Sequence, residues 1–238
     1  MSLNDILDNL FPAGHAVNVE NKVISGTATT VQGTVAVLGT TDAAAIDHAM
    51  ALALSRFILD TVEQHPGRPL VFLVDTSGQA LSRSQELLCL NGSLAHLAQC
   101  VDLARRQGHA SLSLVTANAV SGGFLSFGLM ADRAYALADA QVRVMDLRAM
   151  SRVTKIAHER LVELAANSPT FAPGAENYLR MGGIEAIWPA PSAELLAAAL
   201  DAVSSARAAG DQRMQSGLAR DGRRLAAAVV NSVCHSAV

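Results

Sequence analysis

The sequence predicts an α/β protein in which buried strands alternate with amphipathic helices. The first indication is Leu70–Val74, a continuous apolar run of the kind found in strands that are covered on both faces. The second is that such runs alternate with longer segments whose apolar residues recur every three or four positions, which is typical of helices packed on a sheet. The third is that glycines and small polar residues end the runs.

The first forty or so residues predict a short helix followed by a β meander. Ser2 and Asp5 have the spacing of a capping box, at the start of a helix that runs to Leu10. Short runs rich in valine, threonine and isoleucine follow, separated by glycines, and we expect Gly33 to occupy a tight hairpin turn between two of them. The expected strands are Val17–Val19, Val23–Val31 and Thr34–Leu38.

The next segment predicts a helix, a buried strand and a second helix. Asp42 is expected to cap the first helix, and the stretch His65–Pro69 ends it. The buried strand is Leu70–Val74, and the small residues Asp75–Gly78 form its exit. Apolar residues at helical spacing predict the second helix from Ser84 to Arg106.

The rest of the chain predicts a second strand exit and a helical C-terminus. A strand at Ser111–Thr116 precedes Ser121-Gly122-Gly123 and a short apolar helix. Beyond it we expect strands at Arg133–Leu137, Gln141–Met145 and Ile184–Trp188, and helices over Ser151–Ala166, Glu176–Met181, Ser192–Ala209 and Gly217–His235. This gives one domain over residues 1–238, with a core at about 17–188 and C-terminal helices at about 192–236.

Composition and charge exclude several classes of partner. The chain has 18 basic and 21 acidic residues, a net charge of −3, and no basic run longer than two residues, which argues against a nucleic-acid interface. No apolar stretch approaches the roughly 18 residues of a membrane span. The N-terminus has no signal-peptide pattern, and an odd number of cysteines without framework spacing fits a reducing compartment. We therefore expect a cytoplasmic protein.

Neither the histidines nor the arginines identify a site from the sequence. The seven histidines show no metal-ligand spacing, so we expect no metal centre. Arg143, Arg148 and Arg152 could attract a carboxylate or a phosphate, although paired surface charges are the commoner arrangement.

The most informative feature is the pair of strand exits that contain glycine. A buried strand that ends at glycine and turns into a helix leaves backbone N–H groups free at its exit. The stretches Leu70–Gly78 and Asn118–Gly128 both have this pattern. Two such exits side by side can hold a developing negative charge. The sequence therefore predicts an oxyanion-binding site where the two exits meet.

Three motifs in these stretches resemble the biotin-dependent acyl-CoA carboxyltransferases. They are Leu-Val-Asp-Thr-Ser-Gly-Gln at 73–79, Ala-Val-Ser-Gly-Gly-Phe at 119–124 and Ala-Asp-Arg-Ala-Tyr-Ala at 131–136. The usual pattern is Val-Asp-Thr-Pro-Gly, then Gly-Gly-Ala-Tyr, then Ala-Asp before an aromatic stretch. Here Ser77 replaces the proline, Phe124-Leu125 replaces Ala-Tyr, and the Met-Lys-Met biotinylation motif is absent.

These departures make the chain most similar to the gamma subunits of biotin-independent malonate decarboxylases, over roughly Val17 to Trp188. The resemblance implies an α/β fold of crotonase type (ClpP/crotonase), a spiral of ββα units with C-terminal helices. It implies a heterodimer or higher assembly with a beta subunit. That assembly decarboxylates a malonyl thioester on an acyl carrier protein, whose thiol belongs to a phosphoribosyl-dephospho-CoA group, to the acetyl thioester and CO₂. No covalently bound cofactor and no biotin are expected.

The resemblance also assigns roles to residues at the two exits. Loss of CO₂ leaves negative charge on the thioester oxygen, which fixed N–H donors stabilise. The implied backbone donors are Gly122, Gly123, Gly78 and Gln79, and the implied substrate contacts are Ser77, Ser121 and Phe124. The bound oxygen is either that of the thioester or that of the leaving carboxylate, and Ser77, Ser121 or a partner residue would be the general acid.

Other interpretations remain open. Ala119–Gly123 fits a relaxed serine-hydrolase elbow with Ser121 as nucleophile, and Asp146 with His158 or His235 would complete the order Ser, Asp, His. Against it, Ser121 is expected about five residues beyond its strand rather than on a sharp elbow. The chain would otherwise be a non-catalytic scaffold.

The two exits also have purely structural interpretations. Gly122 and Gly123 would then serve only close helix–strand packing, Ser77 and Ser121 would be caps or turn formers, and Asp75 would brace a turn.

Overall fold

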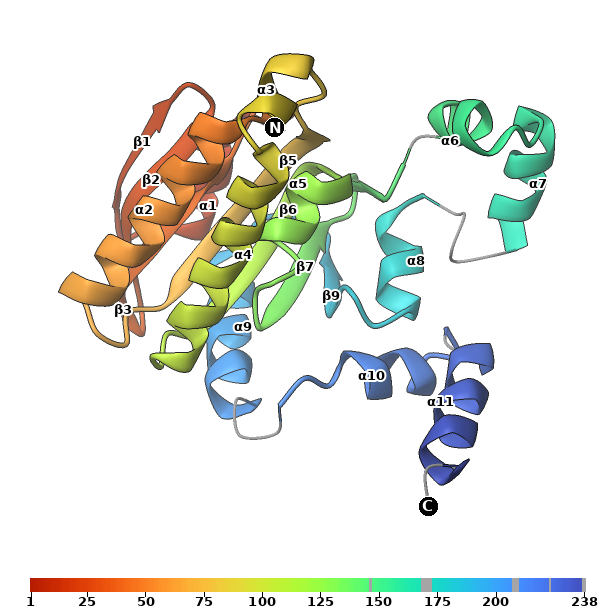
Figure 1. Cartoon of the computed structure of the whole chain (residues 1–238). Helices are drawn as coiled ribbons and strands as arrows, with labels where there is room; N and C mark the ends of the chain where they lie inside the picture. Colours follow the sequence, from red (N-terminus) through yellow and green to blue (C-terminus); the bar gives the residue numbers. More distant parts are fainter. Residues whose placement is uncertain (146, 168–172, 207–209, 223, 237–238) are drawn as a thin grey trace.

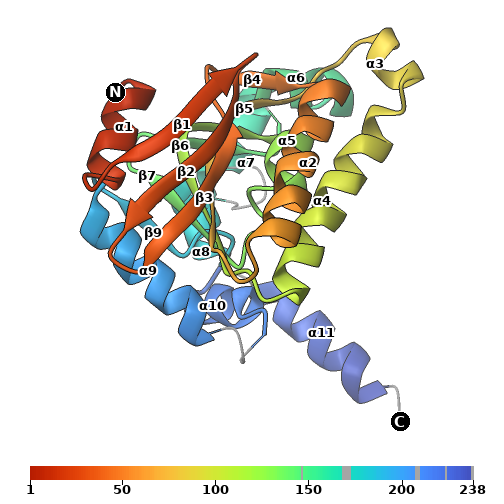
Figure 2. The same ribbon diagram turned by 90° about the vertical axis from the view of Figure 1, so that its left-hand side faces the viewer.

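The computed structural model describes residues 1–145, 147–167, 173–206, 210–222 and 224–236, with the side chains of residues 167, 224, 235 and 236 left aside. Within these ranges the chain forms a nine-stranded sheet covered by helices on both faces (Figures 1 and 2). The strands are β1 (His15–Glu20), β2 (Val23–Thr30), β3 (Gly33–Thr40), β4 (Ala44–Ile46), β5 (Leu70–Gln79), β6 (Ser111–Val120), β7 (Arg133–Leu137), β8 (Gln141–Arg143) and β9 (Ala186–Trp188).

The helices follow the strands in the order that the sequence pattern predicts. They are α1 (Leu3–Leu10), α2 (His48–Gln64), α3 (Arg83–Leu87), α4 (Leu90–Arg106), α5 (Ser121–Ser126), α6 (Leu147–Thr154), α7 (His158–Asn167), α8 (Ala175–Arg180), α9 (Ala193–Ala206), α10 (Arg213–Ala219) and α11 (Arg224–Ser236). None of the helices in the described ranges combines the length and the apolarity needed to cross a bilayer.

The order of the strands places the ends of β5 and β6 at one edge of the sheet. The sheet order is β1-β2-β3-β5-β6-β7-β9, antiparallel through β3 and parallel from there on. The short strands β4 and β8 pair with the last residues of β5 and β6. Since parallel strands end at the same edge, the exits of β5 and β6 lie next to each other.

Strand β5 contributes to the hydrophobic cores on both faces of the sheet. Leu70, Phe72 and Val74 belong to the core that also includes α2 and α4, whereas Val71 and Leu73 belong to the core that includes α1 and α9. Figure 2 shows these two pairs of helices on opposite faces. All five side chains are fully buried, which explains the continuous apolar run, and each such burial contributes about 1.5–3 kcal/mol.

The region before α2 differs from the prediction. Asp47, not Asp42, caps the helix, because the Asp47 carboxylate accepts a hydrogen bond from Met50 N–H at 2.8 Å. Asp42 and Ala43 have positive φ values of 54° and 47° and form a turn that leads into β4. A strand of three residues is too short to show an alternating pattern, so the sequence does not reveal β4.

Three helices predicted as continuous are each interrupted by a left-handed residue. Cys89, with φ 59°, separates α3 from α4, and Lys155, with φ 62°, separates α6 from α7. Asp221, with φ 60°, lies between α10 and α11. Apolar periodicity continues across such breaks, so it does not reveal them. The last three residues of the helix predicted at 192–209 lie outside the described ranges.

Two strands extend further than predicted, and this matters for the site. β5 runs to Gln79 instead of Val74, and β6 runs to Val120 instead of Thr116. The extra residues are small or polar, so composition alone assigned them to loops. β8, in contrast, ends at Arg143, two residues before the predicted end.

We predict that Asp47→Ala destabilises the protein by about 1 kcal/mol, the typical cost of losing an N-cap side chain. For a chain of this size the melting temperature should fall by about 2–4 °C, measured by differential scanning calorimetry. Asp42→Asn serves as the control, because asparagine tolerates the positive φ and the described side chain of Asp42 caps no helix. An equal loss in both variants would contradict this assignment.

Candidate active site

The two predicted exits meet at the carboxyl edge of the parallel strands. Thr76 on β5 lies in register with Ala119 on β6, and α5 begins directly after β6. A Cβ atom on Gly123 would lie 2.9 Å from the Cα of Gly78, so the two main chains touch and no side chain fits between them. The notion that both exits form one site is therefore consistent with the geometry.

The buried side chain of Thr76 fixes the backbone conformation of the β5 exit through hydrogen bonds. Its side chain is fully buried, and its hydroxyl donates to the Ala44 carbonyl at 2.7 Å while accepting from Gly78 N–H at 3.0 Å. Gly78 takes a φ of +104°, which a residue with a side chain adopts only under strain. The turn at Gly78 is thus fixed by one hydroxyl and by its own lack of a side chain.

Two of the four predicted N–H donor groups are engaged within the chain. Gly78 donates to Thr76, and Gly122 N–H donates to the side-chain oxygen of Gln79 at 3.1 Å. Gly123 is the third residue of α5, and the first N–H groups of an α-helix have no partner inside the helix. The glycines therefore serve close packing, and the Gly122 amide already holds a carbonyl oxygen.

Asp75 is a brace rather than an exposed acid. One carboxylate oxygen accepts from both the backbone N–H and the side-chain amide of Asn118, at 3.0 and 3.1 Å. The other accepts from Ala43 N–H at 2.9 Å. Asp75 thereby ties the β4 turn, β5 and β6 together, which agrees with the turn-bracing interpretation.

The sequence placed Asn118 and Gln79 near this edge but did not reveal the hydrogen bonds that their side chains make there. Both lie on strand ends that composition had assigned to loops. The feature that would have revealed them is the pairing of β5 with β6 as far as Thr76 and Ala119, and this pairing is known only from the structure.

The position of Ser121 resembles a serine-hydrolase elbow more than the sequence indicated. The expectation that Ser121 lies about five residues beyond its strand was wrong. Ser121 follows β6 directly and has a positive φ of 48°, the strained conformation of a sharp strand-to-helix turn. Among the described side chains, no histidine hydrogen-bonds to the Ser121 hydroxyl, as a serine nucleophile requires. Asp146 and the side chain of His235 lie outside the described residues.

The two other predicted substrate contacts have different surroundings. Ser77 is exposed at the β5 exit, where a ligand can reach it. Phe124 is 1% exposed and packs edge-to-face on Tyr178 at 6.4 Å between ring centroids. The structure thus gives the Phe124 ring a packing role in the core instead of a surface for substrate.

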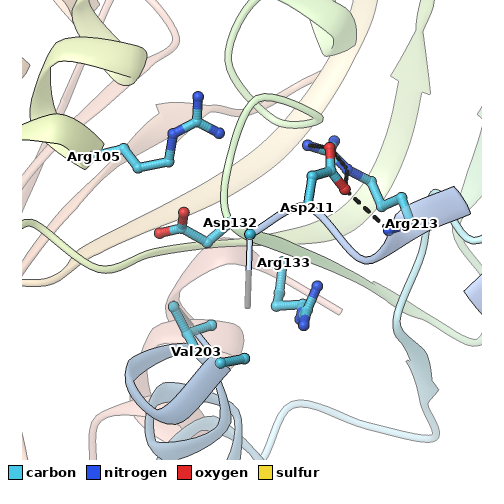
Figure 3. Close-up of a pocket in the computed structure, with 8 residues that line it drawn as sticks. Arg105, Asp132, Arg133, Val203, Asp211 and Arg213 are labelled. Atoms are coloured by element: carbon cyan, nitrogen blue, oxygen red, sulfur yellow. Dashed lines mark hydrogen bonds and ion pairs between the residues drawn. The ribbon is translucent and has the colours of Figure 1, made fainter. Parts of the chain in front are cut away.

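A cavity of about 410 Å³ lies at the other edge of the sheet, where β6 and β7 begin. Figure 3 shows its charged lining. Asp132 accepts from Ser111 N–H at 2.8 Å, and Asp211 pairs with Arg213 at 2.9 Å. The hydrogen bond from Arg213 holds the pKa of Asp211 below its usual value. Arg213 also donates to the Leu129 carbonyl at 2.6 Å, and this bond attaches the start of α10 to the chain between α5 and β7. The cavity lies far from the exits of β5 and β6.

The described residues contain no group of three or more histidine, cysteine, aspartate or glutamate side chains arranged to hold a metal ion.

The mixed nine-stranded sheet and the glycine-lined strand exits are those of a protein with the crotonase-type fold. A family model described as malonate decarboxylase gamma subunit matches residues 40–237, so this chain belongs to that family.

Solved structures with this fold include a Pseudomonas malonate decarboxylase hetero-tetramer in complex with coenzyme A. The TM-score is 0.79, with 24% identity over 97% of both chains. Transcarboxylase 12S gives a TM-score of 0.73 and 17% identity, over 86% of this chain and 42% of its own. At these identities the likeness concerns the fold.

A curated relative is the malonyl-S-ACP:biotin-protein carboxyltransferase MADD of Malonomonas rubra, 36% identical over 121 residues. The match covers 50% of this chain and 41% of that protein.

We predict that Thr76→Val destabilises the protein by about 1–3 kcal/mol, because it removes the acceptor of Gly78 N–H from a buried site at nearly constant volume. Thr76→Ser, which keeps the hydroxyl, should retain most of that stability. Urea unfolding of both variants measures the difference. Equal stability of the Thr76→Val and Thr76→Ser variants would show that the hydroxyl does not fix the exit.

Proposed function

We propose that this chain is the gamma subunit of a malonate decarboxylase. With a beta subunit it would decarboxylate a malonyl thioester on an acyl carrier protein to the acetyl thioester and CO₂. The observation that supports the proposal is the close contact of Gly78 with Gly123, which puts the main chains of the two strand exits side by side. Membership of the family supports the same reaction.

Decarboxylation needs stabilisation of one developing charge. As the carboxylate leaves, electrons move onto the thioester oxygen as an enolate, and a fixed N–H donor there contributes about 3 kcal/mol. The bond from Gly122 N–H to the Gln79 side-chain oxygen shows a carbonyl oxygen held by this amide. In our proposal the substrate oxygen displaces the Gln79 carboxamide, and Gly122 and Gly123 become the donors. Gln79 belongs to the facing exit, whereas the N–H group of Gly78 stays bonded to Thr76 and shapes the turn.

The surface around the exits supports a partner at this edge. Leu81, Leu87 and Leu88 between β5 and α4 are 82%, 77% and 53% exposed, and Leu125 on α5 and Val144 after β8 are 44% and 53% exposed. Exposed apolar side chains gathered in one region are typical of a protein–protein interface. We propose that the beta subunit covers this region and that the substrate lies between the two subunits, with Ser77 and Ser121 in contact with it.

Two further details of the proposal are the prosthetic group of the acyl carrier protein and the cellular location of the reaction. We propose that the carrier thiol belongs to a phosphoribosyl-dephospho-CoA group and that the reaction uses neither biotin nor another cofactor bound to this chain. A cytoplasmic location is supported by the free thiols of Cys89, Cys100 and Cys234, since disulfides are rare in reducing compartments.

A serine hydrolase is the second candidate, favoured by the positive φ of Ser121 at the strand-to-helix junction. Labelling of Ser121 by a fluorophosphonate would support it. Decarboxylation by a complex that carries Ser121→Ala would exclude it.

Co-expression with a beta-type subunit tests the main proposal. The purified complex should release CO₂ from a malonyl thioester of the carrier, and neither subunit alone should do so. Full activity of the partner alone would instead identify this chain as a scaffold. A complex that forms but releases no CO₂ would contradict the proposed activity.

We predict that Gly122→Pro lowers kcat/KM by about 100-fold or more, because proline removes the N–H donor. Gly122→Ala keeps the donor and meets only the flexible end of Gln79, so it should stay close to wild type. Gly123 is unsuitable for this test, because its added Cβ would collide with the Gly78 main chain. Gel filtration checks that both variants still bind the partner, and an active Gly122→Pro complex would contradict the role of this amide.

A further inference from the structure

Arg143 is the charged side chain whose surroundings the proposed function does not yet explain. It is the last residue of β8 and is only partly exposed. Its Nε atom is shielded from solvent and has no hydrogen-bond partner. In the part of the chain that the structure describes, no ion pair or hydrogen bond of Arg143 is present, whereas the sequence had favoured an ordinary paired surface charge.

A shielded Nε–H group without a hydrogen-bond partner lowers the stability of the fold unless a ligand binds to it. A guanidinium group stays charged at every accessible pH, so burial cannot be relieved by losing a proton. Buried polar groups in folded proteins are nearly always hydrogen-bonded, so a shielded Nε–H group without a partner carries an energetic cost. The cost is balanced when an anion occupies the site.

The position of Arg143 places it at the same edge as the strand exits. Arg143 is the register partner of Val120, the last residue of β6. Register partners in adjacent strands lie about 4.8 Å apart, and Ser121, Gly122 and Gly123 follow Val120 directly. The Cα atom of Arg143 therefore lies one strand away from the residue that directly precedes the amide groups of the candidate site.

The charges at this edge have the sign that attracts an anion. Both carboxylate oxygens of Asp75, the acidic residue at the β5 exit, are already taken by the N–H groups of Ala43 and Asn118 and by the Asn118 side chain. Asp75 thus has its own donors and does not serve Arg143. Arg143 thus adds a full positive charge to an edge of the sheet that already carries the partial positive charges of the exit amides.

From this geometry we propose that Arg143 binds an oxygen anion of the acyl-carrier substrate and so holds it against the amides of the β6 exit. This inference rests on the proposed function, because it takes the thioester substrate from it. The anion is the free carboxylate of the malonyl group or a phosphate of the carrier arm. A guanidinium matches both, since its planar N–H groups pair with two oxygens at once.

The kinetic signature follows from the chemistry of the step. The carboxylate loses its charge as CO₂ departs, so an arginine bound to it stabilises the substrate at least as well as the transition state. A phosphate on the carrier arm stays charged throughout, and its binding is uniform. In both cases removal of Arg143 raises KM and leaves kcat unchanged or higher.

The test compares Arg143→Met and Arg143→Lys with wild type in the complex of this chain with its beta subunit. Arg143→Met should raise KM about 10- to 100-fold, as expected for loss of hydrogen bonds to a charged group, without lowering kcat. Arg143→Lys keeps the charge but not the two-pronged geometry, so it should restore part of the loss. Arg56→Met is the matched control, because Arg56 lies on the exposed side of α2 with its side chain 85% exposed, and its KM should equal wild type.

Thermal unfolding separates a binding role from a structural one. An arginine without a protein partner should leave the melting temperature of Arg143→Met equal to or above that of wild type. A clear fall in melting temperature together with the kinetic loss would mean that Arg143 serves the fold and would overturn the proposal.

Two substrates distinguish the two sources of the anion. A malonyl thioester of N-acetylcysteamine has the carboxylate but no phosphate. If Arg143→Met raises KM on this substrate as well as on the carrier, the carboxylate is the bound group; a rise on the carrier alone assigns the phosphate. An unchanged KM on both substrates overturns the proposal while the proposed function stands.

Calorimetric titration with malonate gives a readout that is independent of the reaction. Malonate should bind the wild-type complex more tightly than the Arg143→Met complex. If the wild-type complex releases no CO₂ but shows this difference, the proposed function fails and the anion site remains. Equal or absent malonate binding, combined with unchanged kinetics on the carrier, refutes Arg143 as an anion-binding residue.

Discussion

The close approach of two main chains is the constraint on which the site depends. Gly123 lies against Gly78 so tightly that a single added carbon would collide with the neighbouring strand exit. This contact requires that β5 and β6 run parallel, pair as far as Thr76 and Ala119 after a register shift beyond Val74, and end at the same edge. The hydroxyl of Thr76 and the carboxylate of Asp75 then hold the surrounding turns in position.

Much of this arrangement could be predicted from the sequence, because strong local signals lie where the fold is most regular. The apolar run at the start of β5, the meander and the glycines of both exits all reflect burial or backbone conformation, which residue types report directly. The ends of β5 and β6 could not be predicted in the same way, since strands that finish in small polar residues look like loops. The ring of Phe124 was misassigned because a motif places a residue in the chain but does not say which way its side chain points.

The two edges of the parallel strands differ in how their charges are balanced. At the amino edge, acids and arginines pair with one another or with the main chain, as Asp211 does with Arg213 (Figure 3), and the bond from Arg213 to the Leu129 carbonyl attaches the C-terminal segment there. At the carboxyl edge, Arg143 has no partner among the described residues and leucines such as Leu81 are exposed to solvent. The amino edge therefore has its charges balanced within the chain. The carboxyl edge has the unbalanced charge and exposed apolar side chains that are typical of a binding surface.

The alternation of β5 between both cores has a further consequence for the dynamics of the site. Phe72 and Leu73 belong to different layers, so neither layer can open without disturbing the strand they share. A segment of this kind exchanges its amide hydrogens only in the rare molecules that unfold as a whole. The main chain just before Gly78 should therefore be among the slowest to exchange with heavy water, which would keep the proposed oxyanion-binding groups in place while the exposed apolar side chains around them adapt to the proposed partner.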